Sequence, residues 1–232
     1  MNIIISGGSR GIGREMALYL AGNRDNHILV TGRNENALKE ILNSDPEGNI
    51  SYLCMDLSNI EENVQQVKND IFNHFSRLDI LINNAGVVIV KDFKDISGRD
   101  ARAMMDVNFF GPATLIRILL PLFARGAHIV NIASMGGFQG ARKYRGLSYY
   151  SASRAALACL TECLATELSE TGISVNCLAL GAVQTEMFES AFPGHKAPVQ
   201  PGEMARYIAD FAVNGGKFYN GKILPVAIND PA

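Results

Sequence analysis

Short apolar segments that alternate with longer segments of helical period constrain the fold of this chain more than any other feature. Helical period is found at 13–23, 35–43, 61–75, 98–124, 149–171 and 201–214. Seven strands are predicted around these segments, at 2–6, 27–31, 50–55, 78–83, 128–133, 174–179 and 222–226. Most of them are nearly continuous apolar runs, as expected when helices cover both faces of a sheet. The pattern predicts an α/β fold, a doubly wound, Rossmann-type, mostly parallel seven-stranded sheet with helices on both faces.

The alternation continues through the whole chain, without an internal repeat, a low-complexity tract or a linker. A chain of 232 residues has a length that α/β sheets commonly fill as one unit, so we expect a single domain over residues 1–232. The least regular segment is 187–202, where prolines and glycines gather. Such a segment is typical of a mobile loop or lid, and we expect it to cover a substrate.

Charge and composition argue against several kinds of partner. The net charge is -2, and the lysines and arginines form no basic stripe of the kind that binds nucleic acid or an anionic membrane surface. No stretch looks long and apolar enough to span a bilayer, and the chain begins directly in a strand pattern, so we expect a cytoplasmic protein. The four cysteines lack metal-site spacing; we expect no metal and interpret them as small buried hydrophobes.

The first predicted strand runs into a glycine-rich turn that a helix follows directly. Glycines in such a turn let the backbone approach a pyrophosphate, and the helix N-terminus offers free N–H groups. The glycine spacing differs from the GxGxxG form, and a tight turn without a ligand is the alternative interpretation. The context between strand and helix favours a dinucleotide site built from Gly7, Ser9, Arg10, Gly11, Ile12 and Gly13.

The end of the second predicted strand indicates which dinucleotide is preferred. NAD enzymes place an acidic residue there to bind the adenosine ribose, whereas an arginine accommodates a 2′-phosphate. This strand ends in Thr31-Gly32-Arg33-Asn34, without an acid, and Arg10 adds a second positive charge nearby. Glu35 follows, but we expect it on the next helix. The sequence therefore favours NADP(H), with NAD(H) possible.

Further motifs follow in order along the chain and carry a resemblance to a known family. Asp56-Leu57 follows the third predicted strand, Asn83-Asn84-Ala85-Gly86 follows the fourth, and Asn108 lies in the fourth helical segment. Ser134 ends the fifth strand, Tyr150 precedes Arg154 by four residues, and Gly181, Val183 and Thr185 follow the sixth strand. Together with the glycine turn, these motifs resemble those of the short-chain dehydrogenase/reductase family over nearly the whole chain.

The resemblance implies roles for these residues. Asn108, Ser134, Tyr150 and Arg154 match the catalytic positions. The cofactor-binding positions match the glycine turn with Arg33, Asp56, Leu57, Asn84, Ala85, Gly86, Tyr150, Arg154, Gly181, Val183 and Thr185. The implied activity is hydride transfer between NADP(H) and a small carbonyl or alcohol substrate, as a carbonyl reductase or alcohol dehydrogenase. The resemblance also favours a homodimer or homotetramer.

The residue types suit that chemistry. Reducing a carbonyl places a hydride on carbon and a proton on oxygen, where negative charge develops in the transition state. A phenol is a poor proton carrier near neutrality unless a nearby cation stabilises the phenolate. Tyr150 and Arg154 share one helical face, and Ser134 can donate a hydrogen bond to the same substrate oxygen. The rival phenol, Tyr149, has Ser153 rather than a base four residues later.

Departures from the family pattern leave alternatives open. Arg154 stands where the family has lysine, and a guanidinium does not release a proton to a relay. A non-catalytic or weakly active NADP(H)-binding regulator or sensor is therefore the first alternative, and a sugar-nucleotide epimerase or dehydratase on the same fold is the second. Leu180 replaces a common proline, which implies a modest loosening of the turn after it.

The connection between Ser134 and Tyr150 carries a local basic cluster, Arg142, Lys143 and Arg145. A solvated loop is the simpler interpretation of this cluster. The alternative is that the three cations flank the substrate entrance and favour an anionic group.

Overall fold

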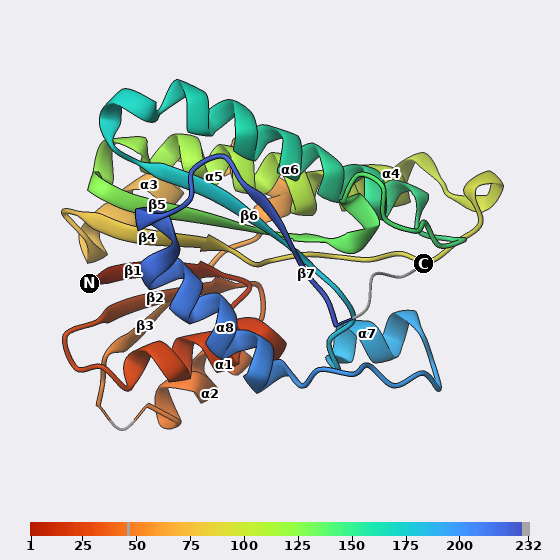
Figure 1. Ribbon diagram of the computed structural model, residues 1–232. Helices are drawn as coiled ribbons and strands as arrows, with labels where there is room; N and C mark the ends of the chain where they lie inside the picture. Colours follow the sequence, from red (N-terminus) through yellow and green to blue (C-terminus); the bar gives the residue numbers. More distant parts are fainter. Residues whose placement is uncertain (46, 229–232) are drawn as a thin grey trace.

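The strands of the described residues form one seven-stranded sheet in which every neighbouring pair is parallel (Figure 1). The computed structural model describes residues 1–45 and 47–228. The strands are β1 (Asn2–Ser6), β2 (His27–Gly32), β3 (Ile50–Cys54), β4 (Leu78–Asn83), β5 (Phe123–Ser134), β6 (Ser174–Leu180) and β7 (Ile223–Val226). Their order in the sheet is β3-β2-β1-β4-β5-β6-β7, so the chain reverses direction across the sheet after β3. The predicted fold class is confirmed.

Helices cover both faces of the sheet. In Figure 1, α1 (Gly11–Ala21), α2 (Glu35–Asn43) and α8 (Pro201–Asn214) lie below it, and α3 (Val64–His74), α5 (Gly111–Leu119) and α6 (Ser148–Glu167) lie above. The fully buried Ile3 and Ile5 pack toward α1 and α8, whereas Ile4 packs toward α3 and α5. Successive strand residues point to opposite faces, so burial of both faces explains the continuous apolar run in β1.

The fourth predicted helical segment, expected over 98–124, forms one helix over Gly98–Leu122 that contains a π turn. It consists of α4 (Gly98–Met105), a π-helical turn (Asp106–Phe110) and α5, and β5 already begins at Phe123. A π turn inserts one extra residue into a helix and often marks a functional position. Here it contains Asn108, which is buried.

The same helical stretch corrects the expectation that no segment could span a membrane. Gly98–Leu122 is long and apolar enough by length and composition alone, and 56% of its apolar window is buried inside the protein. That burial is the property of a core helix, which packs its apolar side chains against a sheet.

Two further expectations are corrected. The segment 187–202 is less irregular than its prolines and glycines indicate, because its first part lies in α7 (Glu186–Ala191), whose N-terminus is capped by the Thr185 hydroxyl. Cys54, Cys159 and Cys163 are exposed, and only Cys177 is buried as expected. Burial raises the pKa of the Cys177 thiol to about 12.

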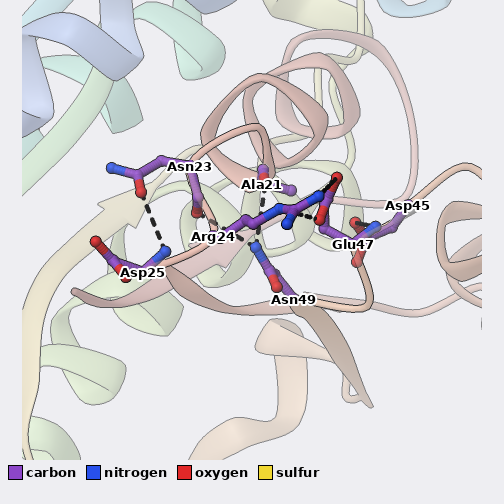
Figure 2. A network of polar contacts seen from close by, with 7 residues as sticks. All are labelled: Ala21, Asn23, Arg24, Asp25, Asp45, Glu47 and Asn49. Atoms are coloured by element: carbon purple, nitrogen blue, oxygen red, sulfur yellow. Dashed lines mark hydrogen bonds and ion pairs between the residues drawn. The ribbon is translucent and has the colours of Figure 1, made fainter.

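A polar network joins the loops at the amino ends of β2 and β3, at the opposite end of the sheet from the motifs (Figure 2). The Asn49 amide donates to the carbonyl oxygens of Ala21 and Asn23, at 3.1 and 3.3 Å, and so binds carbonyls at the end of α1. Arg24 and Glu47 form an ion pair at 2.6 Å. These contacts join the loop that follows α1 to the loop that follows α2.

His128 is a buried titratable group away from the motifs, between β5, β6 and α8. Its Nδ1 donates to the Ala212 carbonyl at 2.9 Å, and its Nε2 accepts from the Asn176 amide at 3.0 Å. Since Ala212 offers only an acceptor and the Asn176 nitrogen only a donor, the contacts select the neutral imidazole. Burial lowers the pKa of His128.

Candidate functional site

A cavity of about 1400 Å³ lies at the carboxyl ends of the strands. Parallel α/β sheets bind ligands at this end, where the loops after the strands converge. Nearly all the predicted site residues line it: Gly7, Ser9, Arg10, Gly11, Ile12, Arg33, Asp56, Leu57, Asn84, Ala85, Gly86, Ser134, Tyr150, Arg154, Gly181, Val183 and Thr185. Gly13 and Asn108 are not among the lining residues, and their contacts place them behind its wall.

The glycine turn is packed too tightly for side chains. Gly7 has a φ of +70°, and a Cβ there would lie 2.7 Å from the Ala85 Cα. A Cβ on Gly13 would lie 2.2 Å from the Gly7 carbonyl oxygen, so Gly13 serves the closure of the turn. The Asn84 amide holds the turn from the neighbouring strand, donating to the Gly7 carbonyl at 3.1 Å.

The first turn of α1 faces the cavity with its backbone donors open. Arg10 occupies the N-cap position in an extended conformation, and its side chain caps none of the N–H groups. Uncapped N–H groups and the positive end of the helix dipole form an anion-binding site. A pyrophosphate therefore fits this end of the cavity.

The two arginines predicted to bind a 2′-phosphate lie in ion pairs. Arg10 Nη1 is 2.6 Å from Glu186 Oε2, and Arg33 Nη1 is 3.8 Å from Asp56 Oδ2. Both arginine side chains are more than three-fifths exposed, at 65% and 63%, so a phosphate can reach them. Glu35 lies on α2 as expected, and a hydrogen bond and the charge of Lys39 hold the pKa of the Glu35 carboxyl below its usual range.

Ser134, Tyr150 and Arg154 line one cavity with the glycine turn. Ser134 ends β5, and Tyr150 lies in the first turn of α6, one helical turn before Arg154. The Arg154 guanidinium carbon is 5.6 Å from the centre of the Tyr150 ring. Tyr149 is not among the lining residues and instead stacks on Phe93, with 6.1 Å between ring centres. The geometry therefore favours Tyr150 over Tyr149.

Arg154 is held where the strands end. Its side chain is buried, and Nη1 donates to the Ile132 carbonyl at 2.9 Å. A Cβ on Gly86 would lie 1.9 Å from Arg154 Nη2, so Gly86 leaves the space that this guanidinium fills. Nε has no hydrogen-bond partner among the described residues. One N–H of this buried cation thus has no acceptor in the described part of the chain, which is uncommon for a buried polar group.

Asn108 forms hydrogen bonds with other residues of the protein and does not line the cavity. Its Oδ1 accepts from the Val87 N–H at 2.8 Å, and its Nδ2 donates to the Val87 carbonyl at 2.9 Å and to Ser153 Oγ at 3.0 Å. Ser153 Oγ in turn donates to the Tyr150 carbonyl at 2.7 Å. The π turn thus connects the loop after β4 to the start of α6.

Sequence reasoning missed Ser153 as part of this connection. Its only signal was the position between Tyr150 and Arg154 on a helix, and that position does not reveal a partner 45 residues away.

The basic cluster does not border the cavity. Arg145 Nε donates to Asp92 at 2.7 Å, and the Lys143 ammonium donates to the Phe138 carbonyl at 2.6 Å. The Arg142 guanidinium lies 5.7 Å from the centre of the Tyr144 ring. The cavity lining includes Tyr144 but none of the three cations. The geometry favours the solvated-loop interpretation over a charged substrate entrance.

Comparisons with known proteins identify the family. A model of the short chain dehydrogenases matches residues 1–196. An uncharacterized oxidoreductase of Staphylococcus saprophyticus is 31% identical over 207 residues, which cover 87% of this chain and 86% of that protein. Dehydrogenase/reductase SDR family member 7B of Xenopus tropicalis is 33% identical over 204 residues, covering 83% of this chain and 64% of that protein.

Solved structures share the fold over the whole chain. A dehydrogenase/reductase from Sinorhizobium meliloti is 28% identical with a TM-score of 0.84, covering 100% of this chain and 95% of that one. A structure of ElxO with NADP bound is 27% identical with a TM-score of 0.84, covering 97% and 96%. The chain belongs to the short chain dehydrogenase family of oxidoreductases.

Proposed function

We propose that this protein transfers a hydride between NADP(H) and a carbonyl or alcohol substrate, with Tyr150 as the general acid in reduction and the general base in oxidation. The observation that carries the proposal is that Tyr150, Ser134 and Arg154 line the same cavity as the glycine turn. We propose further that residues 1–232 work as one dinucleotide-binding catalytic unit and that the segment 187–202 covers the substrate.

The residues that would hold the cofactor run along the cavity. The uncapped N–H groups of α1 suit the pyrophosphate, Asp56 suits the adenine, and Gly181, Val183 and Thr185 suit the nicotinamide amide. The cofactor, when bound, supplies or accepts the hydride.

The protein's own residues handle the proton and the charge on the substrate oxygen. The Tyr150 hydroxyl donates its proton to that oxygen in reduction, and Ser134 Oγ donates a hydrogen bond to it. The positive charge of Arg154 stabilises the phenolate that remains. Because a guanidinium keeps its proton, Arg154 acts through its charge and its position, and Tyr150 must be reprotonated from another source.

The preference for NADP(H) rests on Arg33 and Arg10, which can bind a 2′-phosphate, and on the absence of an acid at the end of β2. The related ElxO structure, which holds NADP, supports the same choice. Equilibrium binding of NADPH and NADH to the protein and to Arg33→Ala tests it. Losing the arginine should weaken NADPH binding on the order of tenfold and leave NADH binding nearly unchanged. Equal weakening of both would contradict the assignment.

The reaction is tested by following NADPH oxidation over a panel of aldehydes, ketones, quinones and oxoacyl esters. Tyr150→Phe removes only the hydroxyl and should lower the rate by ~10²–10⁴ while NADPH still binds. A variant as active as the parent would rule out the proposed role. NADPH binding without turnover of any carbonyl would instead favour a regulator or sensor. This is the second candidate function, because Arg154 stands where the family has lysine.

We also propose a homodimer or homotetramer that uses α6. The outward face of this helix carries Ala152, Ala155 and Cys159, small side chains that are exposed in one chain, while Ala158 faces the core. Sedimentation of the protein and of Ala155→Glu tests this. The charged variant should sediment as a smaller species than the parent.

A further inference from the structure

The part of the cavity beyond the glycine turn is bounded by two apolar walls. Val88, Tyr144 and Leu147 lie on one side, where the segment after β4 meets the loop before α6 and Lys91 N donates to the Gly146 carbonyl at 3.1 Å. Phe188 and Phe192 of the α7 region lie on the other. Both walls line the same cavity as Tyr150, and Leu147 precedes Tyr150 by three residues on the chain. We expect a substrate presented to the Tyr150 hydroxyl to extend from there between these walls.

The α7 wall is a connected aromatic surface. The Phe188 and Phe192 ring centres are 5.2 Å apart, and the His195 ring lies edge-on to Phe192 at 6.5 Å. Both phenylalanines are half-buried although they line an open cavity, whereas His195 is exposed. Aromatic faces at these separations accept another flat ring in stacked or edge-to-face contact.

No lysine, arginine, aspartate or glutamate stands among the cavity-lining residues of 87–93, 138–150 or 187–199. Three charged lining groups elsewhere in the cavity are engaged with protein partners: Glu186 is paired with Arg10, and Arg154 is bound to the Ile132 carbonyl. Apart from Glu186, whose carboxylate is paired with Arg10, the titratable lining side chain of the 186–199 segment is His195, which is exposed. A carboxylate or ammonium on the substrate would lose water between these walls without gaining a partner.

We propose that the substrate is an uncharged carbonyl compound with an aromatic or similarly flat apolar body, or the corresponding alcohol, bound between the Leu147 wall and the Phe188–Phe192 wall. This inference rests on the proposed function. In the reduction, the carbonyl carbon receives the hydride of NADPH and the oxygen receives the Tyr150 proton, so that the alcohol and NADP⁺ are formed.

A matched set of aldehydes tests the substrate class. 2-Naphthaldehyde carries a flat apolar body, 6-formyl-2-naphthoate adds one carboxylate to the same rings, and propanal lacks the body. We expect kcat/KM for 2-naphthaldehyde to exceed each of the others at least tenfold. Equal or higher values for the carboxylate or for propanal would overturn the inference.

Two variants connect the preference to the α7 wall. Phe192→Ala should lower the ratio of kcat/KM for 2-naphthaldehyde over propanal on the order of tenfold, because it removes the ring that the substrate contacts. The matched control is Phe218→Ala, which removes a ring that is 79% exposed and does not line the cavity, and it should leave the ratio unchanged. An unchanged ratio in Phe192→Ala, or the same fall in both variants, would overturn the placement.

A binding measurement separates this inference from the proposed reaction. Saturation-transfer NMR on Tyr150→Phe with NADP⁺ reports whether 2-naphthylmethanol binds and whether its 6-carboxylate binds less. Selective binding of the neutral alcohol without turnover of any aldehyde by the parent would uphold the substrate class and refute the reaction. Turnover of propanal with no selectivity in either assay would uphold the reaction and refute the substrate class.

Discussion

Replacing Gly86 by alanine should disturb the candidate site chiefly through Arg154. The φ of Gly86 lies outside the left-handed region, so the backbone accepts an alanine. The added Cβ would lie 1.9 Å from Arg154 Nη2, 3.0 Å from its Cζ and 3.3 Å from Asn108 Oδ1. Ordinary contact between such atoms begins near ~3.5 Å, so the guanidinium must move by roughly 1.5 Å.

The size of the effect follows from what holds the guanidinium. Arginine ends are usually free to move, but this one is only 4% exposed and donates to the Ile132 carbonyl. Losing a hydrogen bond to a charged group costs ~1.5–3 kcal/mol of stability. A displacement of about 1 Å at a catalytic group can cost ~10² in rate. We therefore expect Gly86→Ala to lower the melting temperature and to lower kcat about a hundredfold.

A double-mutant cycle with Arg154→Lys tests whether the loss of stability and of kcat comes from the contact between the added Cβ and the guanidinium. Lysine has no Nη2 atom, so Gly86→Ala should cost far less in that background, in both stability and kcat. Gly98→Ala is the matched control, because a Cβ there meets nothing within 4 Å and Gly98 begins an exposed helical turn. If Gly86→Ala costs the same with either residue at 154, the proposed fit between Gly86 and the guanidinium is wrong.

Three further predictions concern other parts of the molecule. Burial lowers the pKa of His128 below its ordinary 6.5, so the unfolded chain binds a proton at higher pH than the folded one, and the free energy of unfolding should fall below about pH 6.5 by up to ~1.4 kcal/mol per pH unit. Urea unfolding between pH 8 and 5 should show a smaller pH dependence in His128→Gln than in the parent, and equal pH dependence would exclude His128 as its source. Glu186→Gln removes the ion pair of Arg10 and should tighten NADPH binding by up to about fivefold in a fluorescence titration. Weaker binding would mean that Glu186 orients Arg10 rather than competing with the phosphate for it. Arg154→Lys should lower kcat in the NADPH-oxidation assay, since an ammonium does not span the space that the guanidinium fills; a faster enzyme would identify arginine as a handicap.

The sheet could be predicted from the sequence because its strands are short apolar runs with helical segments between them. Ile3, Ile4 and Ile5 are buried on alternating faces, and a sheet with helices on both faces buries all three. The π turn at Asn108 could not be predicted, because one inserted residue leaves the apolar period nearly unchanged. The early start of β5 was missed because Phe123–Ala127 includes the exposed Arg125 and Gly126, which resemble a loop.

The parts of the site that local motifs form could be predicted from the sequence. The parts that depend on contacts between distant segments could not. The residues around Gly7, Asn84 and Tyr150 form compact motifs, and the fold brings them to one cavity. The Arg10–Glu186 pair and the Phe188–Phe192 wall depend on how a late segment packs. Neither charge nor periodicity in the sequence reveals that packing.

The pairing of Arg10 with Glu186 has a consequence for how the protein is made. The two residues are 176 positions apart, so the glycine turn leaves the ribosome long before its acidic partner exists. A nascent chain that has already formed β1, β2 and β4 presents Arg10 without its counter-charge. The charge around the glycine turn is therefore completed late in translation, when the segment after β6 folds back to place Glu186 beside Arg10.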